Sequence, residues 1–147
     1  MSWVEDAEQK LAAAGRKRGG ARSAVLELLA GQDCALSAIE IEDALRAGSA
    51  GRRRVSRASV YRILDELEDL ALVQKVDTGQ TMVRFERVCP QEGHHHHLVC
   101  DRCGRVMPFS DSKLERAIDE LSARVPLDVA EHEIVLRGAC EDCQAAA

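Results

Sequence analysis

Two cysteine pairs with identical spacing carry the strongest chemical signal in this 147-residue chain. Cys100 and Cys103 form one Cys-x-x-Cys motif, and Cys140 and Cys143 form a second. Each pair brings two thiolates within reach of one tetrahedral ion, and four thiolates close a structural zinc site. A redox motif or two disulfides are the alternatives, but two such motifs in a chain without secretory features favour a shared zinc ion.

A run of four histidines, His94 to His97, leads into the first cysteine pair. The run is internal, which argues against a purification tag, although a solvated polar loop is an alternative. If the run enters a strand, successive side chains project to opposite faces. His94 and His96 then share one face while His95 and His97 share the other, so that one ribbon could serve two metal sites. Imidazole suits zinc, iron, nickel and copper alike.

Four further residues stand where they could complete such sites. Each alone has an ordinary explanation, such as a solvated helix glutamate or a small buried cysteine. They are Glu86 and Cys89 before the histidine run, Glu115 on a predicted helix, and His132 on the last predicted strand, which is the only histidine outside the run.

A basic, hydroxyl-rich segment at 52–62 is the third signal. A helix N-terminus can accept a phosphate, and arginines and hydroxyls on its exposed side can reach bases and backbone. A solvated basic face is the alternative interpretation. The candidate DNA-binding residues are Arg53, Arg54, Ser56, Arg57, Ser59, Tyr61 and Arg62. The far half of the same helix is acidic, so only its first two turns would enter a major groove.

The elements that position this segment follow from hydrophobic periodicity. Helices are predicted at 3–14, 21–30, about 37–48 and 56–71, and short strands at 72–76 and 81–86. Ser37 and Glu40 form a capping box for the third helix. The fourth helix has a buried stripe at helical spacing, formed by Val60, Ile63, Leu64, Leu67 and Leu70. The last three of these helices, followed by a hairpin, predict a winged helix-turn-helix.

The second half of the chain predicts a small α/β domain. Strands are expected at 95–100, 105–109 and 129–137, with a helix at 111–124 whose Leu114, Ile118 and Leu121 face inward. We therefore expect an α+β protein with a DNA-binding domain at 1–87, a hinge at 88–93 and a metal-binding domain at 94–147. A domain this small gains from a structural metal or a partner subunit.

The charge distribution agrees with this division. Residues 1–87 carry 14 basic and 14 acidic side chains, and residues 88–147 carry 6 and 11. Within 16–62 the count is 10 basic against 5 acidic, so the positive charge is concentrated in the predicted DNA-binding part. No segment resembles a signal peptide or a membrane span, which predicts a cytoplasmic protein with reduced thiols and no membrane partner.

Together these motifs resemble the ferric uptake regulator family from Ala21 onward. The resemblance rests on Ser59-Val60-Tyr61-Arg62, Arg84-Phe85-Glu86, the run from His94 to Gly104, Phe109-Ser110-Asp111, His132 and the second cysteine pair. It implies a homodimeric, metal-dependent repressor that binds a double-stranded DNA operator and controls metal uptake genes.

The resemblance also implies three metal sites. The four cysteines of the two pairs resemble structural zinc ligands. His94, His96, Glu115 and His132 resemble a site within the dimerisation domain. The regulatory hinge site would draw on His95 and His97 with Glu86, Cys89 or both. Its metal is expected to be zinc or iron(II), and Cys89 resembles the hinge thiolate of the zinc uptake regulator branch.

The sequence departs from the family pattern at two positions. Iron-sensing members commonly have a histidine just before the third helix, where this chain has Cys34-Ala35-Leu36. Zinc-sensing members of one branch have an aspartate after the recognition helix, where this chain has Gln74. Glu86 is therefore the best candidate to link the hinge site to the DNA-binding domain.

Two other function classes were weighed. A metallohydrolase would need an open metal position and a general base, and the chain has no His-Glu-x-x-His motif. A metal-storage protein would not need a recognition helix. We therefore expect a regulator and not an enzyme.

Overall fold

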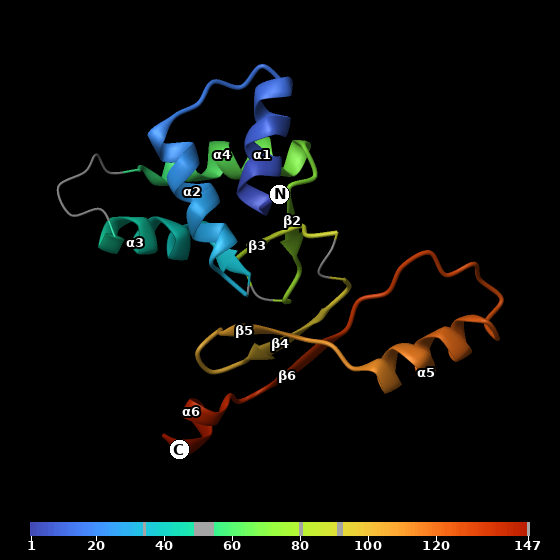
Figure 1. The fold of residues 1–147 in the computed structure, drawn as a ribbon. Coiled ribbons are helices and arrows are strands. Elements are labelled where there is room, and N and C mark those ends of the chain that lie inside the picture. The colour runs from blue at the N-terminus through green and yellow to red at the C-terminus, as the bar shows by residue number, and fades with distance from the viewer. Residues whose placement is uncertain (34, 49–54, 80, 91–92, 147) are drawn as a thin grey trace. The chain divides into compact units, whose positions relative to one another are not determined.

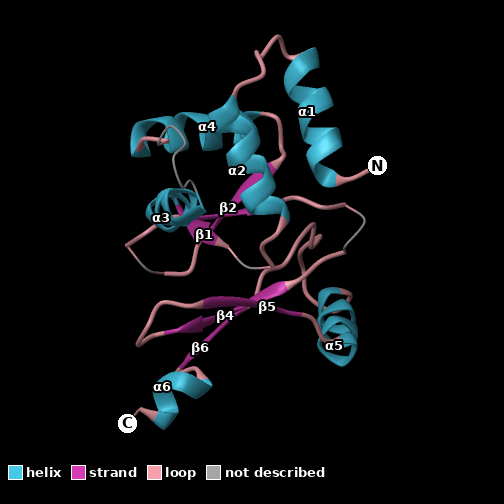
Figure 2. Ribbon diagram, turned by 60° about the vertical axis from the view of Figure 1, so that its left-hand side comes forward, coloured by secondary structure: helices cyan, strands magenta, loops and turns pink. Residues whose placement is uncertain are grey.

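The computed structural model describes residues 1–33, 35–48, 55–79, 81–90 and 93–146. These residues form two compact units, Met1–Gly93 and His94–Ala147 (Figure 1). Each unit has its own three-stranded sheet, with strand order β1-β3-β2 in the first and β5-β4-β6 in the second (Figure 2). The predicted fold class, a winged helix-turn-helix followed by a small α/β domain, is confirmed.

Four helices build the first unit, and local capping explains where three of them begin. Ser2 and Glu5 form a capping box at the start of α1. The predicted box of Ser37 and Glu40 is also present: the Glu40 amide donates to Ser37 Oγ, and the Ser37 amide to Glu40 Oε2. Ser56 caps the last helix by accepting from the Ser59 amide. The helices are α1 Trp3–Ala13, α2 Gly20–Ala30, α3 Ala38–Gly48 and α4 Arg57–Asp69.

The core of the first unit lies between these helices. The predicted stripe on α4 is buried at Val60, Ile63, Leu64 and Leu67, while Leu70 is only partly buried against it. On α2, Val25, Leu26 and Leu29 are buried, and Leu28 is partly buried against the same core. This helix contacts α1, α3 and α4, so its buried stripe is broader than a single helix contact would require.

The wing is the antiparallel sheet of the first unit. Its strands are β2 Val73–Val76 and β3 Arg84–Arg87, joined by an additional strand, β1 Leu36–Ser37, that the sequence did not predict. The second wing strand begins three residues later than expected. Arg84 at its start is buried, and its guanidinium donates to Glu40 Oε2 at 2.6 Å. This ion pair joins the wing to the beginning of α3.

The sheet of the second unit is centred on β4 His96–Cys100. The strand β5 Val106–Phe109 pairs with it in the antiparallel sense, and β6 Val135–Gly138 pairs in the parallel sense. The predicted strand at 129–137 was therefore wrong in extent, and His132 precedes β6. Pairing begins at His97 with Val135. The preceding Ile134 amide donates to His96 Nδ1, a side-chain atom, and not to a strand carbonyl. The short helix α6 Glu141–Ala145 follows.

The helix α5 Ser112–Ser122 is capped by Asp111, whose side chain accepts from two backbone amides. Its predicted inward-facing residues are only partly covered: Leu114 and Ile118 are half-buried. None of its residues is buried, and Leu121 is exposed. The described part of the same unit therefore covers the apolar stripe only in part. No helix among the described residues is long and apolar enough to cross a membrane.

Replacing Leu64 by alanine should destabilise the first unit by about 2–5 kcal/mol, because a fully buried leucine leaves a cavity that helices around it cannot fill. Val83→Ala, at an exposed position of the same unit, should change stability by less than about 0.5 kcal/mol. Denaturant unfolding followed by circular dichroism measures both. Equal losses for the two variants would contradict this placement of the core.

Candidate metal and DNA-binding sites

The four thiols of the two Cys-x-x-Cys motifs are brought together by strand pairing. Cys100 ends β4, Cys103 lies in the turn after it, and Cys140 and Cys143 lie at the beginning of α6 and inside it. The parallel pairing of β4 with β6 carries the C-terminal pair alongside the first one. All four sulfurs lie within 4.8 Å of one another, and none of the described cysteines forms a disulfide.

The spacing of these sulfurs fits one zinc ion. Cys100 Sγ lies 3.8 Å from Cys143 Sγ, and Cys103 Sγ lies 3.8 Å from Cys140 Sγ. Four sulfurs at about 2.3 Å from a tetrahedral centre are separated by about 3.8 Å, so these two separations match a zinc site. Amide hydrogen bonds from Cys103 and Cys140 lower the pKa of Cys100 to about 6. A hydrogen bond with Cys140 and burial raise the pKa of Cys143 to about 12.

A second cluster contains His94, His96, Glu115 and His132. One ligand atom from each lies within 4.8 Å of the others. The Glu115 carboxylate bridges two rings: one oxygen contacts His96 Nε2 and the other lies 2.7 Å from His132 Nε2. The rings of His94 and His132 are 4.6 Å apart. Strand β4, helix α5 and the segment before β6 therefore all contribute to this cluster.

The protonation of this cluster suits metal binding. Burial lowers the pKa of His94, and the neighbouring His96 lowers it further. Burial alone would raise the pKa of Glu115, but hydrogen bonds with His96 and His132 outweigh it and hold that pKa below its ordinary value. Neutral imidazole and ionised carboxylate are the forms that coordinate a metal. Three nitrogens and a carboxylate make a donor set for zinc or another divalent transition metal.

The other two histidines of the run lie together on the opposite face. The rings of His95 and His97 are 5.0 Å apart, and His97 is buried. Glu133, which the sequence analysis passed over, has its Oε1 atom 4.0 Å from His97 Nδ1. It directly follows His132, which joins the other cluster. The alternation used for the histidine run, applied to the residues around His132, would have singled it out.

The remaining predicted hinge residues lie in the first unit. Glu86 is on β3 and accepts a 2.6 Å hydrogen bond from Gln74 Nε2 on the paired strand β2. Cys89 follows β3, and Arg87 donates to its sulfur at 2.9 Å. Gln74 therefore contacts the carboxylate that was predicted to link the hinge site to the DNA-binding domain.

The predicted DNA-binding residues lie on the first two turns of α4 and just before it. Arg57, Tyr61 and Arg62 are exposed, opposite the buried stripe of the same helix. Ser56 is exposed as the N-cap, and Ser59 is half-buried next to it. Arg53 and Arg54 fall outside the described residues, as does Cys34. The helix therefore presents a basic, hydroxyl-bearing end to solvent.

Comparison with known proteins agrees with these features. The model of the Ferric uptake regulator family matches residues 13–137. A Ferric uptake regulation protein of Vibrio parahaemolyticus is 30% identical over 141 residues, covering 95% of this chain and 91% of that protein. The chain belongs to the ferric uptake regulator family. Members of this family are metal-dependent transcription regulators.

Solved structures of the family share the whole fold. The ferric uptake regulator of Vibrio cholerae has a TM-score of 0.75 and 32% identity, covering 90% of this chain and 98% of that one. The Helicobacter pylori regulator, described as having three functional metal-binding sites, has a TM-score of 0.80 and 26% identity, covering 97% of this chain and 91% of that one. A zinc-bound manganese uptake regulator also shares the fold, with a TM-score of 0.77 and 21% identity. The match covers 91% of this chain and 98% of that one.

Replacing Cys100 or Cys140 by serine should remove one zinc ion per chain and unfold the second unit, because zinc-binding energy is also folding energy here. Metal content measured by mass spectrometry and thermal unfolding measured by circular dichroism test this. Cys89→Ser is the matched control, since that thiol lies outside the cluster, and it should keep this zinc ion and the fold. A Cys100→Ser protein that remains fully folded without zinc would contradict the structural role.

Proposed function

We propose that this protein is a metal-dependent repressor that binds a double-stranded DNA operator as a homodimer in the cytoplasm and controls metal uptake genes. One observation carries the proposal: the same chain joins a winged helix with an exposed basic helix end to a unit that assembles two separate clusters of metal donors. Neither a hydrolase nor a metal store has a use for the recognition helix.

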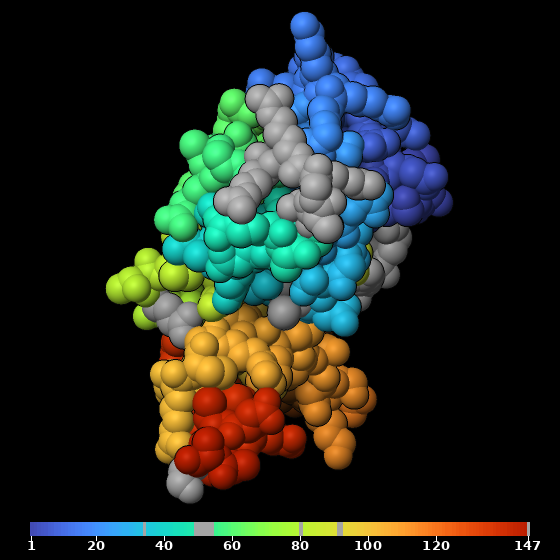
Figure 3. Space-filling model, turned by 90° about the vertical axis from the view of Figure 1, so that its left-hand side faces the viewer, coloured from blue at the N-terminus to red at the C-terminus, as the bar shows by residue number. Residues whose placement is uncertain are grey.

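The DNA-reading surface is the beginning of α4, with the preceding arginines. Figure 3 shows the face on which α3, in blue-green, lies beside α4, in green. Arg57, Tyr61 and Arg62 project from the exposed side of α4, so they can reach phosphates and base edges when the helix enters a major groove. Arg53 and Arg54 precede the helix in the sequence and extend the same basic segment.

The uncovered apolar face of the second unit supports the homodimer. Helix α5 buries none of its residues, although Leu114, Ile118 and Leu121 recur at helical spacing. Leu127 is 71% exposed, and Leu136 on the edge strand β6 is also exposed. A second copy of the chain would cover these side chains, as the obligate interfaces of homodimers do.

The sensing step is assigned to a hinge site. Glu86 and Cys89 belong to the end of the DNA-binding domain, 1–87, and to the hinge, 88–93, while His95 and His97 belong to the dimerisation domain, 94–147. A metal bound by both sets would fix the two recognition helices at the spacing of successive half-sites, roughly 34–36 Å. Metal then favours the DNA-competent arrangement by binding it more tightly than the others.

The regulatory metal is proposed to be zinc, nearest to the zinc uptake branch of the family. The supporting feature is Cys89, since a thiolate with two imidazoles and a carboxylate suits tetrahedral zinc. Iron(II) is the alternative, favoured by the relatives named ferric uptake regulation proteins and by the N/O set of Glu86, His95 and His97. The four cysteines hold structural zinc, and the cluster around Glu115 is a second site in the dimerisation domain.

Tyr61→Ala should weaken operator binding about 10-fold or more while metal content and stability stay unchanged, because the ring is exposed on the side of α4 opposite the core. Fluorescence anisotropy with a duplex selected from a random pool measures the affinity at fixed salt. Asp69→Ala, at the exposed far end of the same helix, is the control and should bind as the wild type does. Equal affinities for all three proteins would place the reading face elsewhere.

The hinge site is tested by comparing its ligands with those of the other cluster. His97→Ala and Cys89→Ala should keep a folded dimer with its structural zinc but lose metal-dependent DNA binding. His94→Ala and His132→Ala should have a smaller or different effect. Operator affinity is titrated against buffered free zinc and, separately, free iron(II). Wild-type responses from the His97 and Cys89 variants would exclude this site as the sensor, whereas a dispensable Cys89 with an equal response to iron(II) would favour iron.

A further inference from the structure

Glu42 on α3 holds two arginines with one carboxylate. Its Oε2 atom lies 2.8 Å from Arg57 Nε, and its Oε1 atom lies 2.9 Å from a terminal nitrogen of Arg46. The Glu42 side chain is only 11% exposed, whereas Arg46 and Arg57 are 51% and 54% exposed. The carboxylate therefore sits inside the groove between α3 and α4, and the two cations are fixed above it at the surface.

The position of Arg57 makes this contact informative. Arg57 is the first residue of α4, where the positive end of the helix dipole disfavours a cation. The first turn of α4 holds no acidic residue of its own to offset that charge. Glu42 supplies the compensation from the neighbouring helix, and its hydrogen bond raises the pKa of the Arg57 guanidinium. The orientation of the Arg57 side chain is therefore fixed by a partner on another helix, Glu42.

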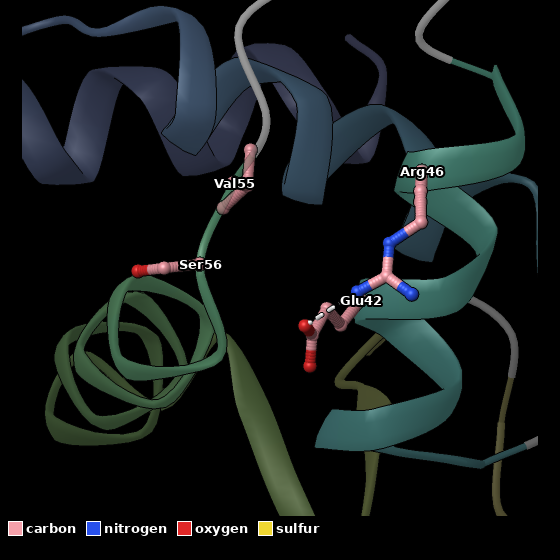
Figure 4. A pocket seen from close by; sticks show the side chains of 4 residues that line it. All are labelled: Glu42, Arg46, Val55 and Ser56. Atoms are coloured by element: carbon pink, nitrogen blue, oxygen red, sulfur yellow. Dashed lines mark hydrogen bonds and ion pairs between the residues drawn. The ribbon is translucent and has the colours of Figure 1, made fainter.

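The ion pairs border open space and are not packed into the core. A cavity of about 230 Å³ is lined by Glu42, Arg46, Val55 and Ser56. In Figure 4 the side chain of Arg46 reaches along α3 toward Glu42, with the beginning of α4 at Ser56 on the other side of the cavity. The cluster therefore lies at the same end of α4 that we assign to DNA.

We propose that Glu42 is a positioning residue for DNA recognition: it orients Arg57 at the start of the recognition helix and cancels part of the positive charge that Arg46 and Arg57 would offer to any DNA backbone. The inference rests on the proposed function, because it requires α4 to bind DNA. Glu42 then increases sequence discrimination. It lowers the sequence-independent attraction, which grows with each phosphate that a cation neutralises, and it leaves Arg57 in one fixed direction.

A purely structural role predicts a different outcome. The arginine ends of both ion pairs are more than half exposed, and ion pairs at the surface contribute about 0–1 kcal/mol. Helices α3 and α4 already pack through buried Ile41, Val60 and Leu64. Removing the charge of Glu42 should therefore leave the first unit folded. If the carboxylate served only to join the helices, its loss would weaken binding to every duplex in the same proportion.

The test compares Glu42→Gln with Asp43→Asn in the metal-loaded full-length protein. Asp43 is the adjacent residue of α3, is 62% exposed and lies 3.8 Å from Arg46, so its variant makes the same charge change without removing the contact to Arg57. Affinities for a selected operator duplex and a scrambled duplex are measured by fluorescence anisotropy over a salt series. Arg57→Ala and the double variant with Glu42→Gln complete a cycle.

We expect Glu42→Gln to bind the scrambled duplex about 3- to 10-fold more tightly than the wild type, with a steeper salt dependence. Its affinity for the operator should increase by a smaller factor or decrease. The ratio of operator to scrambled affinity should fall about 10-fold. Asp43→Asn should leave this ratio within about 2-fold of the wild type. In the Arg57→Ala background, Glu42→Gln should lower the ratio by much less, because the residue acts through Arg57.

Three results would overturn the inference. The first is an unchanged ratio of operator to scrambled affinity in Glu42→Gln. The second is an equal loss of affinity for both duplexes with a lower melting temperature, which would indicate a structural role. A third is an equal fall in the ratio for Asp43→Asn, which marks net charge alone. A wild-type protein that binds neither duplex when loaded with metal would overturn the proposed function and this inference together, so the two failures are distinguishable.

Discussion

The parallel pairing of β4 with β6, closed by four thiolates at its end, is the constraint on which the second unit depends. Only five residues of this unit are buried among those described: His96, His97, Val99, Cys100 and Val106. So small an apolar core does not offset the entropy of ordering more than fifty residues. A zinc ion held by all four cysteines would join the C-terminal end of the chain to β4 and keep the histidine-bearing strand in register.

That register explains how one short strand can serve two metal clusters. Side chains alternate along β4, so His96 meets Glu115 of α5 while His97 lies on the opposite face beside Glu133. The residues ahead of β6 continue the arrangement, since the His132 ring lies beside His94 and His96, whereas Glu133 lies beside His97. A shift of the strand by one residue would exchange the two donor sets. The structural site therefore positions both other clusters, although it shares no ligand with either.

Much of this could be predicted because the signals are local. Cysteine spacing, the alternation of the histidine run and the capping box of Ser37 and Glu40 all depend on residues close in sequence. The contribution of Glu115 and His132 was expected on the family resemblance, and the structure brings both to the run.

The errors arose where the deciding contact comes from elsewhere. The strand β6 begins only where β4 offers a partner, so the alternating pattern at 129–134 was not enough to predict pairing. The apolar stripe of α5 is less buried than its periodicity suggests, because periodicity cannot show whether the covering surface belongs to the same chain. Glu42 was missed because an acidic side chain on a helix has no sequence signature until its cation is located in space.

Helix α3 provides carboxylates that form ion pairs with arginines of two other elements of the first unit. Two of its glutamates, two residues apart, each hold an arginine from another element: Glu40 pairs with the buried Arg84 of the wing, and Glu42 pairs with Arg57 of α4. Residues spaced by two lie on different sides of a helix, so one carboxylate can face the sheet and the other the recognition helix. The wing and the recognition helix are thus both oriented against the same short helix. Because Glu42 pairs with Arg57 and Arg46, the proposed DNA-binding surface carries less free positive charge than its arginine content suggests.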